Sequence, residues 1–87
     1  MKIDILGKSE EKIKMQKMAV AIQQAASNVN IPVTINFTHN FMSYSGSSMN
    51  PVMTPHVFIE GNLEFSGSAL PIAVMQKKLV EYRDKGS

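Results

Sequence analysis

The sequence predicts a single α/β domain in which one mixed sheet of four strands carries helices on both faces. Two observations lead to this prediction. Segments with the two-residue alternation of strands and segments with the apolar spacing of helices follow in the order strand, helix, strand, short helix, strand, strand, helix. The 87 residues are also too few for more than one core. We expect one domain over residues 1–85, and a frayed tail or a cloning remnant at residues 86–87.

The chain opens with a strand and a long amphipathic helix. Residues 2–6, KIDIL, alternate between polar and apolar side chains, and Gly7 ends this strand. A helix is then predicted from Ser9, as its N-cap, to about residue 28, where the following Asn residues can adopt a left-handed cap. One face of this helix collects its apolar side chains: Met15, Met18, Ala19, Ile22, Ala26 and Val29.

A second strand is predicted at residues 31–37, IPVTINF, where Val33, Ile35 and Phe37 alternate with polar residues. The three elements together form a βαβ unit, whose crossover should be right-handed and whose strands should be parallel. Residues 38–52 carry the weakest signal, and either a short helix or a flexible loop fits them.

The second half of the chain predicts a hairpin followed by a helix. Residues 56–60 and 63–65 are short apolar runs, and Gly61-Asn62 between them is typical of a two-residue turn. Pro71 suits the first turn of the last helix. Its apolar face contains Ile72, Met75, Leu79 and Tyr82.

The composition excludes several classes of function. The chain has no cysteine, so it forms no disulfide, performs no thiol chemistry and builds no Cys-based metal site. A net charge of +2 is too small to favour nucleic acid as a partner. No apolar run is long enough to cross a bilayer, and residues 1–6 do not form a signal peptide, so we expect a cytoplasmic protein without a membrane partner.

The segment TPHVFIEGNLEFSG, residues 54–67, together with KIDILG and the two helices, resembles the thioredoxin fold. More narrowly, the chain is similar to small single-domain thioredoxin-like proteins of archaea and bacteria, over residues 2–82. The resemblance implies that the Thr54–Pro55 peptide bond is cis, which is uncommon and usually marks a specific tight turn. It also implies that the backbone beside Pro55 pairs with an extended substrate peptide by strand addition.

The chain departs from this family where the family keeps its two cysteines. The resemblance places those positions at Glu10 and Ile13, the latter partly shielded, and neither side chain exchanges disulfides. It implies a binding surface between the start of the first helix, the proline turn and the Ser-Gly segment, which we call the cis-Pro groove. The predicted groove residues are Lys8, Ser9, Glu10, Ile13, Met53, Thr54, Pro55, His56 and Gly67.

These residues favour a redox-inactive module that binds a peptide or protein partner without a cofactor, a metal or a catalytic residue. One alternative is an enzyme without thiol chemistry that uses Glu10 or His56 in the same groove. Another is a member of a thiol-disulfide oxidoreductase family that has lost its cysteines. Acidic residues also favour the first turn of any helix, and no nucleophile–base pair stands at readable spacing, so binding is the preferred interpretation.

Other side chains have ordinary structural explanations beside functional ones. His39 and His56 lack metal-ligand spacing and fit solvent-facing or hydrogen-bonded histidines better than metal ligands. The lysines at the start of the first helix fit a solvated helix face better than a phosphate site. The methionine cluster Met42, Met49 and Met53 fits a loose core or an adaptable contact surface.

Overall fold

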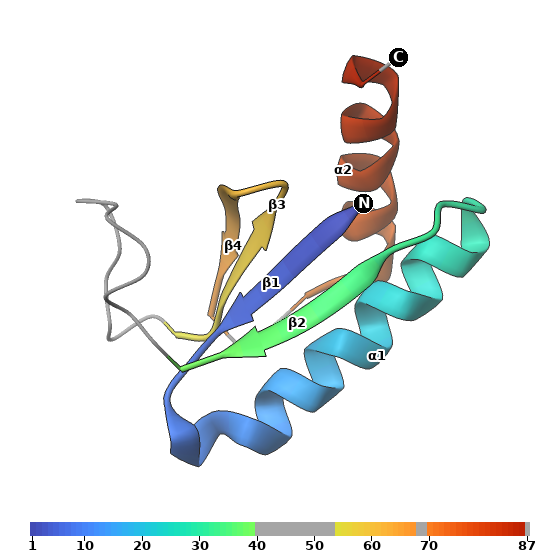
Figure 1. Cartoon of the computed structure of the whole chain (residues 1–87). Helices are drawn as coiled ribbons and strands as arrows, with labels where there is room; N and C mark the ends of the chain where they lie inside the picture. Colours follow the sequence, from blue (N-terminus) through green and yellow to red (C-terminus); the bar gives the residue numbers. More distant parts are fainter. Residues whose placement is uncertain (40–53, 68–69, 87) are drawn as a thin grey trace.

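The structure, a computed structural model, describes residues 1–39, 54–67 and 70–86. They contain a mixed sheet of four strands and two α-helices (Figure 1). The strands are β1 (Lys2–Leu6), β2 (Thr34–Thr38), β3 (His56–Ile59) and β4 (Asn62–Ser66). Their order in the sheet is β2-β1-β3-β4, with β1 parallel to β2 and antiparallel to β3, which is antiparallel to β4. The predicted mixed sheet and its parallel first pair are therefore confirmed.

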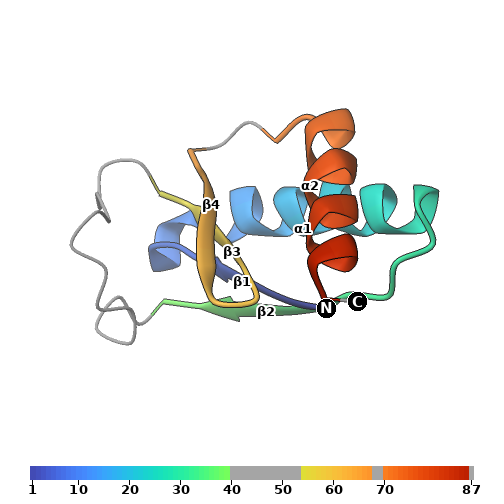
Figure 2. The same cartoon turned by 90° about the horizontal axis from the view of Figure 1, so that it is seen from above.

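The first helical segment is a 3₁₀ turn, η1 (Ser9–Glu11), continued by α1 (Lys12–Asn28), and the last is α2 (Ile72–Lys85). Both α-helices lie on the same face of the sheet and contact each other (Figure 2). The short helix considered for residues 38–52, which would have covered the other face, falls mainly in residues 40–53, outside the described residues. Gly86 caps α2, since its amide donates to the Tyr82 carbonyl at 3.1 Å.

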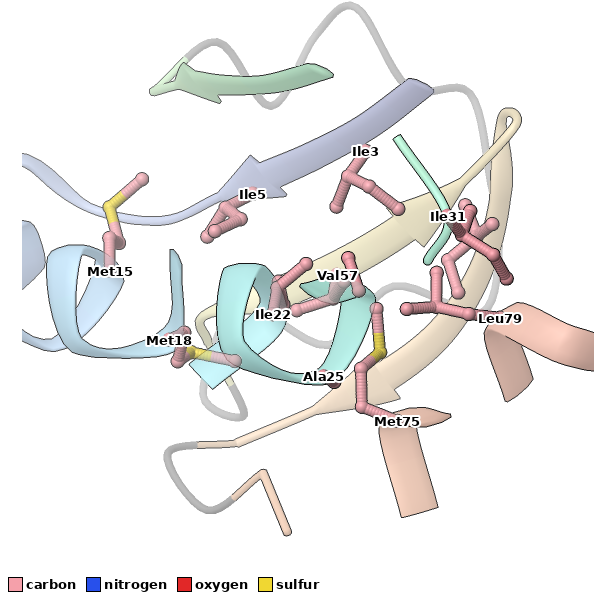
Figure 3. Close-up of a cluster of buried hydrophobic side chains, with 12 residues drawn as sticks. Ile3, Ile5, Met15, Met18, Ile22, Ala25, Ile31, Val57, Met75 and Leu79 are labelled. Carbon is pink, nitrogen blue, oxygen red and sulfur yellow. The ribbon is translucent and has the colours of Figure 1, made fainter. Parts of the chain in front are cut away.

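One hydrophobic core lies between the sheet and the two helices (Figure 3). Ile3, Ile5 and Val57 point from the strands toward Ile22 of α1 and Leu79 of α2. The predicted apolar face of the first helix is confirmed, with Met15, Met18, Ile22 and Ala26 buried and Ala19 and Val29 packed against them. Burial of these apolar side chains is the main favourable contribution to folding.

The alternate side chains of β1 and β3 point away from this core. Leu6 and Phe58 are buried on the opposite face, as are Asp4 and His56. Because successive residues of a strand face opposite sides, both faces of the two central strands are buried. Such strands read as nearly continuous apolar runs, which explains the sequence of residues 56–59.

Three element boundaries differ from the prediction. Lys8, rather than Ser9, is the N-cap residue, because the carboxylate of Glu11 accepts the Lys8 amide at 2.9 Å. The second strand begins at Thr34 instead of residue 31, after Asn30 at φ 56° and Pro32, which has no amide hydrogen to donate. The hairpin turn is Glu60-Gly61, with φ of 50° and 85°, so it stands one residue before the predicted pair.

Candidate functional site

Three segments that are distant in sequence meet at the predicted cis-Pro groove. They are the helix start Lys8–Glu11, the turn Thr54–Pro55 and the end of β4 at residues 66–67. The carboxylate of Glu11 accepts a hydrogen bond from the Thr54 hydroxyl at 2.6 Å, and the amide of Gly67 donates to the Pro55 carbonyl at 3.0 Å. The first bond ties the helix start to the turn, and the second ties the turn to β4.

Glu11 and Gly7 hold the start of the first helix in place. Glu11 accepts the Lys8 amide through the oxygen that also accepts the Thr54 hydroxyl, and its own amide donates to the Lys8 carbonyl at 2.9 Å. A Cβ atom at Gly7 would lie 2.8 Å from the sulfur of Met15, which is buried. Glycine therefore lets the chain leave β1 directly above the first turn of α1.

The electrostatics of the helix start favour an ionised Glu11. Partial burial acts to raise the pKa of this carboxyl, but the hydrogen bonds from the Thr54 hydroxyl and the Lys8 amide act to lower it. The positive charges of Lys14 and Lys8 act in the same direction. Because the lowering effects dominate, the pKa of Glu11 lies below its ordinary value.

The proline turn lies buried beside the helix start, to which the Thr54 hydroxyl is hydrogen-bonded. The Thr54–Pro55 peptide bond is cis, Thr54 is 8% exposed, and the side chain of Pro55 is fully buried. Gly67 adopts φ 96°, in the left-handed region that favours glycine, as it turns its amide to Pro55. Two backbone segments and a helix start, rather than a set of reactive side chains, thus form this part of the molecule.

Both histidines are hydrogen-bonded to residues at or next to these segments. His56 is 1% exposed, its Nδ1 lies 2.8 Å from the Ser66 hydroxyl, and its ring meets Phe58 edge to face. His39 donates from Nδ1 to the Gly7 carbonyl at 2.8 Å. Among residues 1–39, 54–67 and 70–86, no group of three or more His, Cys, Asp and Glu side chains is placed to hold a metal ion.

The structure therefore divides the predicted groove residues. Lys8, Ser9 and Glu10 are exposed at the helix start, and Thr54, Pro55 and Gly67 are joined to it as described above. His56 is buried in the sheet, and Met53 lies outside the described residues.

Ile13 does not occupy the shielded position that the resemblance implied. Its side chain is 68% exposed. Seven residues separate it from Val20, which is 70% exposed, so the two side chains lie on one stripe of α1.

Sequence reasoning missed the part that Glu11 plays. The glutamate three residues after Lys8 is a usable signal for a helix start. Its second partner, Thr54, stands 43 residues away, and no local pattern indicates that contact. Ser66 was likewise missed as the partner of His56.

A second surface runs between α1 and the outer edge of β2, and we call it the β2 edge groove. It has a volume of about 620 Å³. Its lining residues are Ala19, Val20, Gln23, Gln24, Ser27, Ile35 and Phe37. No charged side chain lines this groove, and Val20 and Phe37 expose much of their apolar surface.

Comparison with protein-family models, with curated proteins and with solved structures finds no match to this chain. Of the helices in the described part of the chain, none is both long and apolar enough to cross a membrane. What the site can do chemically is therefore inferred from its own residues, none of which carries a thiol.

Proposed function

We propose that the chain has a thioredoxin-like fold and acts as a redox-inactive module that binds an extended peptide or protein segment in the cis-Pro groove. One observation carries the proposal. The bonds Glu11–Thr54 and Gly67–Pro55 hold three backbone segments together at one surface, in a chain without cysteine.

The strand order supports the thioredoxin-like part of this proposal. The parallel β1–β2 pair and the antiparallel β3–β4 hairpin support the strand arrangement that the resemblance implies for residues 2–82. A helix on the other face, between β2 and β3, remains part of the proposal.

The construction of the groove favours an extended backbone as its ligand. In the proposed groove the inner wall would be the turn Thr54–Pro55, which leads directly into β3. An extended segment can be held at such a wall by main-chain hydrogen bonds, with side-chain pockets adding selectivity. Exposed Ser9 and Glu10 at the rim would then contact the partner's side chains.

The enzyme alternative uses Glu10 or His56 as an acid or base in the groove, and convergence of the two side chains in one pocket would favour it. Glu10 is exposed, whereas His56 is 1% exposed and engaged with Ser66. A general acid or base must reach the proton that it transfers, within about 3 Å or through one water. No specific observation favours catalysis by these residues, so binding is the function proposed.

The test is a peptide selection followed by mapping of the bound surface. Short random peptides from a display library are selected on the immobilised protein, and the best binder is titrated into isotopically labelled protein. We expect amide shifts at residues 8–11, 54–56 and 67. Shifts confined to α2, around residues 76–83, would overturn the proposal, as would the absence of any selected binder.

A matched pair of variants sharpens this test. Glu10→Arg changes the rim of the groove, and Glu81→Arg makes the same change on the exposed side of α2. We expect the first to weaken peptide binding about tenfold or more, since rim charges affect recognition, and the second to leave binding unchanged. Reduction of insulin by a dithiol should proceed at its background rate with either protein or none, because no thiolate can attack a disulfide.

A further inference from the structure

The strand β2 stands at one end of the sheet order, so its outer edge pairs with no other strand in the described part of the chain. The Thr34 amide donates to the Met1 carbonyl, and the Thr38 carbonyl accepts a hydrogen bond from the Gly7 amide. These backbone groups of β2 therefore face β1. Because backbone groups alternate in direction along a strand, the amides and carbonyls of Ile35 and Phe37 face outward. This edge offers two donors and two acceptors to another strand.

The outer edge of β2 lacks the features that usually prevent an edge strand from pairing with another chain. Residues 34–38 read TINFT, with no charge and no proline within the strand. Natural edge strands are commonly protected by lysine, proline or a bulge. Above the edge, the β2 edge groove is also free of charge, and depletion of charge is the compositional mark of an interface core.

Of the five large apolar side chains that are exposed in the described part of the chain, three lie on β2 or α1, and the other two lie on α2. Phe37 is 49% exposed on β2, and Val20 and Ile13 are 70% and 68% exposed on the facing side of α1. In Figure 1, β2 is the outermost strand and lies beside α1. An additional strand next to β2 would cover Phe37 and Val20 and complete the groove between strand and helix.

We propose that two copies of the chain pair through their β2 strands, antiparallel, about a two-fold axis at Asn36. This pairing joins the two four-stranded sheets into a single sheet of eight strands. In this register Ile35 of each copy faces Phe37 of the other, and they exchange about four main-chain hydrogen bonds in total. On the face of the sheet that carries the helices, the β-branched Ile35 pairs with the aromatic Phe37 of the other copy. On the opposite face, Thr34 pairs with Thr38 of the other copy. Both are favourable cross-strand pairs.

Charge favours a second copy in this orientation. The lysines of α1 all lie in its first half, at Lys12, Lys14 and Lys17, and its second half carries no charge. The antiparallel two-fold places the basic half of each helix beside the uncharged half of the other. There the lysines approach a helix C-terminus, where positive charge is favourable, and the two basic halves stay apart.

The first test measures the oligomeric state against concentration by light scattering and sedimentation. We expect a dimer that dissociates on dilution. Phe37→Lys should raise the dissociation constant about tenfold or more, because it places a like charge on both sides of the edge. Val74→Lys is the matched control, since Val74 is 47% exposed on α2, and it should leave the dimer intact. A wild-type chain that stays monomeric at every accessible concentration overturns the proposal.

The second test fixes the register, and the cysteine-free chain makes it clean. Asn36→Cys places two thiols at the axis, where facing Cα atoms of such a pair are about 4.5 Å apart, so oxidation should link the dimer covalently. Thr34→Cys and Thr38→Cys should not link to themselves, because their own mates lie about 13 Å away, but an equal mixture of the two should link. Efficient self-linking of Thr34→Cys, or none with Asn36→Cys, overturns this register.

Discussion

At the scale of single residues, Glu11 contributes most to the site. Its carboxylate joins the Lys8 amide and the Thr54 hydroxyl, which belong to segments far apart in sequence. A hydrogen bond to an ionised group contributes more than a neutral one. The charge on Glu11 should therefore stabilise the groove, and its contribution should depend on pH.

Glu11→Gln should lower the free energy of unfolding at neutral pH by about 0.5–1.5 kcal/mol. The pKa of Glu11 is lowered in the folded state, so its stabilising effect is present above the unfolded pKa and is lost as pH falls through the folded pKa. Urea unfolding at a series of pH values measures the difference between wild type and variant. That difference should shrink toward zero in acid.

Glu10→Gln serves as the control, because Glu10 is exposed, and it should change stability little at any pH. A stability difference for Glu11→Gln that persists unchanged in strong acid would show that the charge of Glu11 is not what stabilises the fold.

Residue-level features were predictable where they depend on neighbours in sequence. Asn30 takes the expected left-handed conformation after α1, because asparagine tolerates it better than other side chains do. The contact of Glu11 with Thr54 could not be predicted, since it depends on two loops that only the folded sheet brings together. The burial of His56 follows from β3 being covered on both faces, which the apolar run at residues 57–59 suits but which the histidine itself does not indicate.

At the scale of elements, two sequence arguments made opposite predictions for the exposure of the Ile13 side chain. The apolar period of the helix runs through Met15, Met18 and Ile22 and leaves residue 13 off that face. The resemblance implied a shielded side chain there instead. The exposure of Ile13 agrees with the period, because packing against the sheet decides which face of α1 is buried.

The double variant Glu10→Cys, Ile13→Cys should close an intramolecular disulfide on mild oxidation. Residues three apart at a helix start have Cα atoms about 5–6 Å apart, within disulfide range. Both side chains replaced are exposed, so the exchange should leave no cavity in the core. Thiol titration and mass spectrometry at low protein concentration provide the measurement.

Glu10→Cys with Lys17→Cys is the matched control, since seven residues separate the thiols by about 10 Å along the helix and both should stay free. If the thiols at positions 10 and 13 also stay free, the geometry assigned to the helix start is wrong.

At the scale of the whole molecule, the sheet and the helices were predictable because each element carries its own period and all must share one core. Strand boundaries at the second strand and the hairpin were not, because the second strand begins three residues late, after Pro32, and the positive φ of Glu60 moves the hairpin turn by one residue. The side of the sheet on which a helix packs is a property of the assembled chain, and the two described helices share one side.

The core of this molecule gives it a built-in chemical reporter. Met15, Met18 and Met75 are at most 3% exposed, and with no thiol in the chain their thioethers react with peroxide without competition from cysteine. Hydrogen peroxide should convert the more accessible Met1 to its sulfoxide first and reach the three core methionines only when the helices part from the sheet. Their oxidation rates, followed by peptide mass spectrometry, should rise together with added urea. Oxidation of Met15 as fast as Met1 in native buffer would mean that the first turn of α1 opens independently of the rest of the core.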